Sequence, residues 1–259
     1  MERITSRDNE KIKQLIRLQT NRKARRESDT FVAEGVRLAQ EVLRCGLTVL
    51  QVFATEEGVR RCGGVWEALC QKAEQAFLIH ESLESRISEV KAPQGVYCVC
   101  RIPHQPLSEL ASAGRRFLAL DRLQDPGNMG TIIRTADAAG FDGAILSGAC
   151  ADLYSAKTLR ATMGSVFRVP ARRVEDLPGE LEALKAKGYA VVATELGGAD
   201  FYANCPHEKA VLVIGSEGNG VSQAVRDAAT HHLALPMRGG AESLNAAVAA
   251  GIMIYEMAR

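Results

Sequence analysis

Residues 235–251 of the chain read LPMRGGAESLNAAVAAG, and they combine the end of a strand, a glycine loop and an apolar helix. Pro236 must end the strand-like run before it, because proline cannot donate a hydrogen bond to a sheet ladder. Two glycines then let the backbone approach a ligand closely. Ser243 can cap a helix whose first residues, Leu244 and Asn245, face that loop, and a buried helix start with free backbone donors suits a polar ligand. Taken alone, the stretch is equally compatible with a plain loop before a C-terminal core helix.

The composition is that of a globular α/β protein of one or two domains. The chain has 259 residues, of which 46% are hydrophobic and only 5% aromatic, and its 23 glycines suit many tight strand-to-helix turns. No apolar run is long enough to cross a bilayer, and the start of the chain lacks the apolar core of a signal peptide. The seven cysteines form no C-x-x-C pair. We therefore expect a cytoplasmic protein with reduced thiols, no membrane segment and no metal site.

A net charge of +1 conceals a basic N-terminal segment. Residues 1–30 carry nine Lys or Arg against five acidic residues, a balance of +4. Four of those cations lie within residues 21–26 (NRKARR), which we expect to be polar and irregular. Such a cluster can neutralise phosphates and release counterions, although a solvated surface run has the same composition. The candidate phosphate contacts are Arg22, Lys23, Arg25 and Arg26.

Strand-like and helix-like segments alternate on both sides of a break that contains Pro103 and Pro106. We assign residues 1–102 to a compact α/β domain, residues 103–115 to a linker and residues 116–259 to a second domain. Apolar strands that alternate with helices in the second domain predict a mostly parallel sheet covered on both faces. Its strands are expected at residues 117–120, 144–146, 165–169, 189–195, 211–214 and 231–235.

Three loops follow strands of this sheet, and ligands bind beyond the carboxyl ends of parallel strands. One of them reads GSEGNG, which has the pattern G-x-x-G-x-G and not the G-x-G-x-x-G of dinucleotide enzymes. The chain also contains no G-x-x-x-x-G-K-[ST] sequence, so ordinary Rossmann oxidoreductases and P-loop enzymes fit poorly. The loops lie at residues 194–198, 215–220 and 235–243.

Two polar residues follow the first strand of the second domain. Asn128 is expected to cap a helix that runs from about Met129 to Ala139. Arg134 then lies nearly two turns into that helix, and by residue type alone it is most simply an exposed surface arginine.

Read together, three segments resemble the motifs of the SpoU/TrmH family of RNA ribose 2′-O-methyltransferases, in the family's order. They are residues 125–137 (DPGNMGTIIRTAD), residues 213–221 (VIGSEGNGV), and residues 235–237 with 243–249 (LPM and SLNAAVA). Residues 31–37 (FVAEGVR) further resemble the start of the ribosomal-L30e-like substrate-binding domain that many members carry at the N-terminus. The resemblance spans nearly the whole chain.

The resemblance implies an α/β fold with a smaller N-terminal L30e-like domain. The C-terminal domain is implied to be a Rossmann-like parallel sheet of the SPOUT superfamily, with a deep trefoil knot, and to form a homodimer that binds S-adenosylmethionine. The implied activity is methyl transfer from S-adenosylmethionine to a ribose 2′-hydroxyl of structured RNA, ribosomal RNA more than transfer RNA. The alternatives are a tRNA methyltransferase, a non-catalytic RNA-binding protein with a decayed cofactor fold, and an ordinary nucleotide-dependent Rossmann enzyme.

The family's functional residues carry over by position, and Arg134 is implied to reach the partner subunit's site. Arg134 is also the family's candidate base. A charged guanidinium has no acceptor, however, so we expect Arg134 to hold a phosphate and to stabilise the developing alkoxide. The implied catalytic residues are Asn128, Arg134, Glu217, Ser243 and Asn245. The implied cofactor-binding residues are Thr194, Glu195, Gly215, Glu217, Gly220, Leu235, Met237, Ser243 and Leu244.

Overall fold

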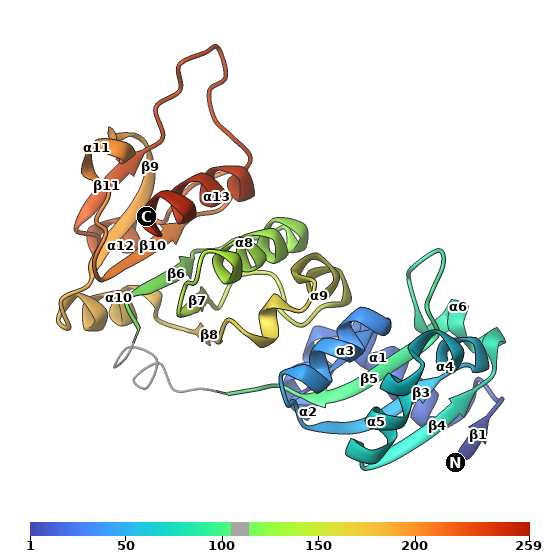
Figure 1. Cartoon of the computed structure of the whole chain (residues 1–259). Coiled ribbons are helices and arrows are strands. Elements are labelled where there is room, and N and C mark those ends of the chain that lie inside the picture. The colour runs from blue at the N-terminus through green and yellow to red at the C-terminus, as the bar shows by residue number, and fades with distance from the viewer. Residues whose placement is uncertain (105–113) are drawn as a thin grey trace. The chain divides into compact units, whose positions relative to one another are not determined.

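A computed structural model describes residues 1–104 and 114–259, and the chain forms two compact units (Figure 1). The segment Asp152–Phe167 belongs to the first unit, although it follows strands of the expected second domain. Most of the linker expected at residues 103–115 lies outside the described residues. The N-terminal unit comprises Met1–Pro103 and Asp152–Phe167, and the C-terminal unit comprises His104–Ala151 and Arg168–Arg259.

The N-terminal unit is built on a five-stranded sheet of order β1-β4-β3-β5-β2, in which β5 runs antiparallel to β2 and β3 and the other pairs are parallel. Helix α1 buries Ile12, Leu15 and Leu18, at the spacing of an amphipathic helix, in a core with Phe53 and Tyr97. The strands are β1 (Glu2–Ile4), β2 (Thr30–Glu34), β3 (Val49–Ala54), β4 (Gln75–Ile79) and β5 (Val96–Arg101). The helices are α1 (Glu10–Thr20), α2 (Arg22–Ser28), α3 (Val36–Arg44), α4 (Glu56–Cys62), α5 (Gly64–Lys72), α6 (Glu84–Ile87) and α9 (Ala156–Thr162), with 3₁₀ turns η1 (Glu81–Leu83) and η2 (Ser165–Phe167).

Two expectations about local structure are wrong. The basic segment is not irregular: it forms α2, because the Asn21 side chain accepts a hydrogen bond from the Ala24 N–H and so caps the helix. Residues 165–169 are not a strand, since η2 occupies Ser165–Phe167 and the next strand begins at Ala171. A short apolar run does not distinguish a buried strand from a buried turn by its pattern alone.

The C-terminal unit contains the predicted parallel sheet. All of its strand pairs are parallel, in the order β11-β9-β10-β6-β7-β8. Helices α10 and α12 pack with Phe117, Val191 and Val211 in one core, while α13 packs against α8 and β10. The strands are β6 (Arg116–Leu120), β7 (Gly143–Ser147), β8 (Ala171–Val174), β9 (Ala190–Asp200), β10 (Ala210–Ile214) and β11 (His231–Ala234). The helices are α8 (Pro126–Ala138), α10 (Leu177–Lys185), α11 (Phe201–Asn204), α12 (Gln223–Asp227) and α13 (Ala246–Met257).

An irregularity in the sheet places the loop after Ala193. The register of β11 against β9 jumps from His232 opposite Ala193 to Leu233 opposite Ala199. The intervening residues of β9 therefore bulge out of the ladder, next to the loops that follow β10 and β11. Figure 1 shows the long excursion between β11 and α13 on the same unit.

Candidate functional site

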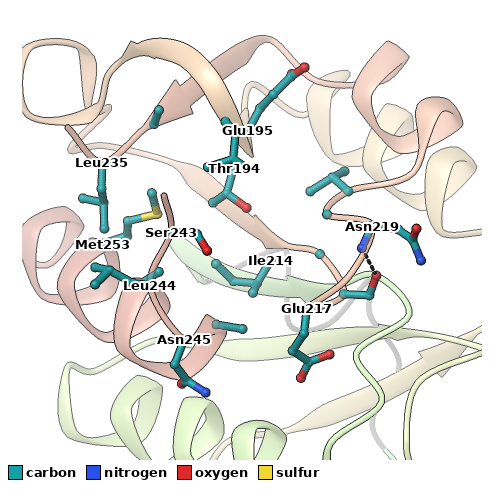
Figure 2. A pocket seen from close by; sticks show the side chains of 18 of the residues that line it. Thr194, Glu195, Ile214, Glu217, Asn219, Leu235, Ser243, Leu244, Asn245 and Met253 are labelled. Carbon is teal, nitrogen blue, oxygen red and sulfur yellow. Dashed lines mark hydrogen bonds between the residues drawn. The ribbon is translucent and has the colours of Figure 1, made fainter. Parts of the chain in front are cut away.

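A cavity of about 650 Å³ lies beside the bulge of β9 and the carboxyl ends of β10 and β11 (Figure 2). Its walls come from the three loops that the sequence placed at strand ends, and from the first turns of α13. All nine residues implied to bind the cofactor line it, which brings together segments up to fifty residues apart: Thr194, Glu195, Gly215, Glu217, Gly220, Leu235, Met237, Ser243 and Leu244. The structure assigns no ligand to these residues, so cofactor binding by each of them stays a prediction.

The loop after β10 forms one wall because of its glycines. Ser216 and Gly220 exchange two backbone hydrogen bonds, of 3.0 and 2.9 Å, and Gly220 has a φ of +62°. A Cβ on Gly215 would lie 2.1 Å from the Gly220 carbonyl carbon. Only glycine fits at position 215, since this closed turn presses directly on its Cα.

Large apolar side chains border the cavity on one side, where Figure 2 shows Leu235, Leu244 and Met253. Leu196 in the β9 bulge is 77% exposed and Leu244 is 38% exposed. Apolar side chains left in water around a concave surface are typical of a ligand site.

Polar groups from all three motifs meet at the other edge of the cavity. The Asn128 side-chain N–H donates to Glu217 Oε1 at 2.9 Å, and the Asn245 side-chain N–H donates to Asn128 Oδ1 at 3.1 Å. Glu217 and Asn245 line the cavity directly. Three of the five implied catalytic residues thus form one hydrogen-bonded chain.

Two helix caps differ from the expectation. Asn245, not Ser243, caps α13, because its side chain accepts from the N–H groups of Ala247 and Val248. Asp125, not Asn128, caps α8 by accepting from the Asn128 N–H. The Asn128 side chain is therefore not used as a helix cap, and it donates a hydrogen bond to Glu217 instead. Ser243 lines the cavity as an exposed residue of the preceding loop.

The rim of the cavity carries a second charged group. Glu195 Oε2 lies 2.9 Å from His232 Nδ1, and Glu195 Oε1 lies 3.5 Å from the guanidinium of Arg226. The sequence reasoning singled out Glu195 but missed Arg226, which lines the cavity from α12. Its position follows from the fold of the loop after β10, and no local motif marks it.

Arg134 is not among the cavity residues. It is exposed on α8, so within this chain the structure does not bring its side chain to the other implied catalytic residues. This placement is compatible with the implied contribution to a partner subunit.

The four cations of the basic cluster at residues 21–26 differ in their exposure to solvent. Lys23 and Arg26 are exposed and Arg22 is half-buried. Arg25 is only 4% exposed, and its guanidinium lies 2.6 Å from Asp152 and donates to the carbonyl oxygens of Leu18 and Gln19. This burial and pairing argue against a contact between Arg25 and RNA, because the guanidinium is turned away from solvent and toward Asp152 and two backbone carbonyls.

Within the parts of the chain that the structure describes, no three His, Cys, Asp or Glu side chains gather in a way that could hold a metal ion. None of the helices found in those parts is both long and apolar enough to span a membrane.

Each of the two units matches the model of a known protein family. Residues 115–255 match the model of the SpoU rRNA Methylase family, and residues 9–98 match the model of an MRM3-like substrate binding domain. The first match contains all three motifs, and the second contains the basic cluster and the segment at residues 31–37.

Whole-length relatives agree with these matches. The chain is 38% identical over 258 residues to the 23S rRNA (guanosine(2553)-2′-O)-methyltransferase RlmP of Bacillus subtilis, with 99% of both chains covered. It is 34% identical over 271 residues to the 23S rRNA (uridine(2479)-2′-O)-methyltransferase of Streptomyces viridochromogenes, covering 99% of this chain and 92% of the relative. The crystal structure of an AdoMet-bound rRNA methyltransferase from Sinorhizobium meliloti superposes with a TM-score of 0.85 at 33% identity, covering 99% and 97% of the two chains.

Proposed function

Because the chain belongs to the SpoU rRNA methylase family, we propose that it transfers a methyl group from S-adenosylmethionine to a ribose 2′-hydroxyl of ribosomal RNA. Whole-length relatives named for 23S rRNA support the large-subunit RNA as the substrate. Their names give a guanosine and a uridine, so the base at the target is left open. A cytoplasmic location is part of this proposal.

One observation carries the proposal: side chains from three separate motifs, Asn128, Glu217 and Asn245, form a single hydrogen-bonded chain at the edge of one cavity. A protein that had lost cofactor binding would not need these three side chains in this arrangement. The non-catalytic alternative is therefore disfavoured.

The cavity fits S-adenosylmethionine. Its volume of about 650 Å³ is in the range of small-molecule sites, and the exposed side chains of Leu196, Met237 and Leu244 offer apolar surface for an adenine ring. The bare Cα of Gly215 lets the ligand approach the backbone. When bound, S-adenosylmethionine supplies a methyl carbon on a sulfonium, which is electrophilic.

The residues of the chain then act mainly by positioning. A displacement at carbon needs the ribose oxygen close to the methyl carbon and on the axis of the bond that breaks, and such orientation contributes roughly 7–11 kcal/mol. Ser243 and Asn245 lie at the cavity and can hold the ribose there. Arg134 holds an RNA phosphate and stabilises negative charge that develops on the ribose oxygen.

We further propose a homodimer in which Arg134 completes the partner's site, and a knotted C-terminal unit. Helix α13 exposes Val248 at 52% and Tyr255 at 54%, and it packs against α8, which carries Arg134. An interface over these two helices would cover the apolar side chains and bring Arg134 to the second cavity. In the N-terminal unit, Arg22, Lys23 and Arg26 are the proposed RNA contacts.

The test is methylation of total RNA with labelled S-adenosylmethionine, followed by mapping of the product, alongside calorimetry with S-adenosylmethionine. Label in ribosomal RNA at a ribose 2′-oxygen is expected. Label in tRNA alone would favour the tRNA alternative, and RNA binding without S-adenosylmethionine binding would favour the non-catalytic one. Binding of NAD or ATP in its place would favour an ordinary Rossmann enzyme.

A further inference from the structure

The start of helix α13 fixes the direction of the hydrogen-bonded chain at the cavity. The backbone N–H groups of Ala247 and Val248 can only donate, and they lie 2.9 and 3.3 Å from Asn245 Oδ1. The Nδ2 of Asn245 must therefore face the other way, where it meets Asn128 Oδ1. That contact in turn directs the Asn128 Nδ2 to Glu217 Oε1. Rotating the amide of Asn128 or Asn245 by half a turn would place two donors or two acceptors opposite each other.

This series of hydrogen bonds ends at the carboxylate of Glu217, which has one oxygen without a hydrogen-bond partner in the part of the chain that the structure describes. Glu217 Oε1 accepts from Asn128, whereas none of the described residues donates a hydrogen bond to Glu217 Oε2. Glu217 is exposed and lines the cavity, so a bound ribose can reach that oxygen. Glu195 differs, because both of its oxygens are paired, with Arg226 and His232.

The other groups that line the cavity are less suited to accept a proton, because they are already paired, are cations, or are much weaker bases than a carboxylate. Among the described residues that line it, the titratable side chains are Glu195, Glu217 and Arg226. Arg226 and Arg134 are cations without an acceptor, and the Ser243 hydroxyl and the Asn245 amide are far too weak as bases. Among the described residues that line the cavity, Glu217 alone offers a carboxylate oxygen without a hydrogen-bond partner.

We propose that Glu217 Oε2 accepts the proton of the ribose 2′-hydroxyl, and that Asn128 and Asn245 are positioning residues that hold this carboxylate. The inference rests on the proposed function. The ribose O–H bond breaks as the oxygen bonds the methyl carbon, and the electron pair of the broken carbon–sulfur bond stays on sulfur. The sulfonium and the carboxylate become a neutral thioether and a neutral carboxylic acid, which returns its proton to water. A base held in place contributes about 10²–10⁴-fold in rate.

Glu217→Gln tests the proposal with little disturbance, because its amide oxygen can still accept from Asn128 while the base is gone. We expect kcat on unmodified ribosomal RNA transcribed in vitro to fall about 10²–10⁴-fold, with the calorimetric Kd for S-adenosylmethionine within about threefold of wild type. Glu217→Asp keeps a carboxylate on a shorter side chain, so its kcat should lie between those of wild type and Glu217→Gln. Glu182→Gln, the same substitution at an exposed position of α10, is the matched control and should match wild type.

Three outcomes would contradict the proposed role of Glu217, and a fourth would contradict the proposed function. Wild-type kcat in Glu217→Gln overturns the proposal, as does identical behaviour of the Gln and Asp variants. Loss of S-adenosylmethionine affinity with kcat retained would make Glu217 a counter-charge for the cofactor and also overturn it. Wild-type protein that methylates no RNA would overturn the proposed function itself, which separates the two failures.

Discussion

Asn245 Nδ2 lies 3.1 Å from Asn128 Oδ1 across 117 positions of the sequence. The contact joins the cap of α13 to the first turn of α8, and Asn128 extends it to Glu217 after β10. Each motif is unremarkable as local structure: two helix starts and a glycine turn. Their meeting turns three loops into one polar edge of a cavity, and the capping of α13 sets the orientation of every group in it.

Asn245→Asp separates capping from orientation. Aspartate caps a helix as well as asparagine does, so the melting temperature should stay close to wild type. Its second oxygen would face Asn128 Oδ1, however, and two acceptors cannot share a hydrogen bond. We expect kcat to fall at least tenfold and its pH dependence to change, since Asn128 no longer directs an N–H to Glu217.

The matched variant is Asn245→Ala, which loses both roles. It should lower the free energy of unfolding by about 0.5–2 kcal/mol as well as kcat, measured by urea denaturation and by methyl transfer. Wild-type kcat and pH dependence in Asn245→Asp would show that the link to Asn128 is incidental.

Gly215→Ala should destroy the cavity wall. A Cβ there would lie 2.1 Å from the backbone of Gly220, so the loop after β10 must open. We expect S-adenosylmethionine affinity to fall by more than tenfold in calorimetry. Gly64→Ala at the start of α5 meets no atom within 4 Å and lies outside the cavity lining, so it serves as the control, with the affinity of wild type. Equal losses in both variants would contradict the steric argument.

The resemblance of three motifs predicted the family, and the alternation of apolar strands and helices predicted the parallel sheet. Comparison with SpoU proteins confirmed the family and the fold class. The glycines and Pro236 mark strand ends wherever the rest of the chain lies. Strand ends of one parallel sheet share an edge, so loops at residues 194–198, 215–220 and 235–243 could be expected to meet.

Two of the differences from expectation depend on contacts over long sequence separations. The cap expected at Asn128 belongs to Asp125, and the Asn128 side chain instead donates to Glu217, 89 positions away in the sequence. Arg25 looked like a surface cation beside Arg26, but its carboxylate partner is 127 residues away in sequence. A pattern of neighbouring residues contains no information on such partners.

Arg25→Ala should lower the free energy of unfolding. It should leave the salt dependence of RNA binding unchanged, because the lost charge is buried. Its guanidinium is 5% exposed and pairs with Asp152, which is 17% exposed, so removal strands a largely buried carboxylate at a cost of about 3 kcal/mol. Arg26→Ala at an exposed position should change stability by less than about 0.5 kcal/mol. In a salt titration of RNA binding, Arg26→Ala should lower the slope by about 1. An unchanged slope would remove Arg26 from the RNA site.

Buried thiols should make the fold less stable in alkali. Burial raises the pKa of the Cys62 thiol to about 11 and that of the Cys100 thiol to about 12, whereas in the unfolded chain both lose their protons near pH 9. Above pH 9 the folded state therefore holds more protons than the unfolded state, and stability falls as pH rises. Urea denaturation at pH 8 and pH 10 should show this fall, and Cys62→Ala should make it shallower. A slope identical to that of wild type in Cys62→Ala would contradict the assignment.

Arg134 offers a test of both its role and the homodimer. If its charge holds a phosphate, Arg134→Lys should keep measurable methyl transfer while Arg134→Ala loses about 10²–10³-fold; equal and complete loss in both, with RNA binding intact, would count against this role. If Arg134 acts in the partner's site, co-expressed Arg134→Ala and Glu217→Gln chains should form mixed dimers in which one site holds both native side chains. Activity well above that of either variant alone is then expected, because that site draws Glu217 from one chain and Arg134 from the other. Failure of purified mixed dimers to recover activity would place Arg134 in the site of its own chain or outside the reaction.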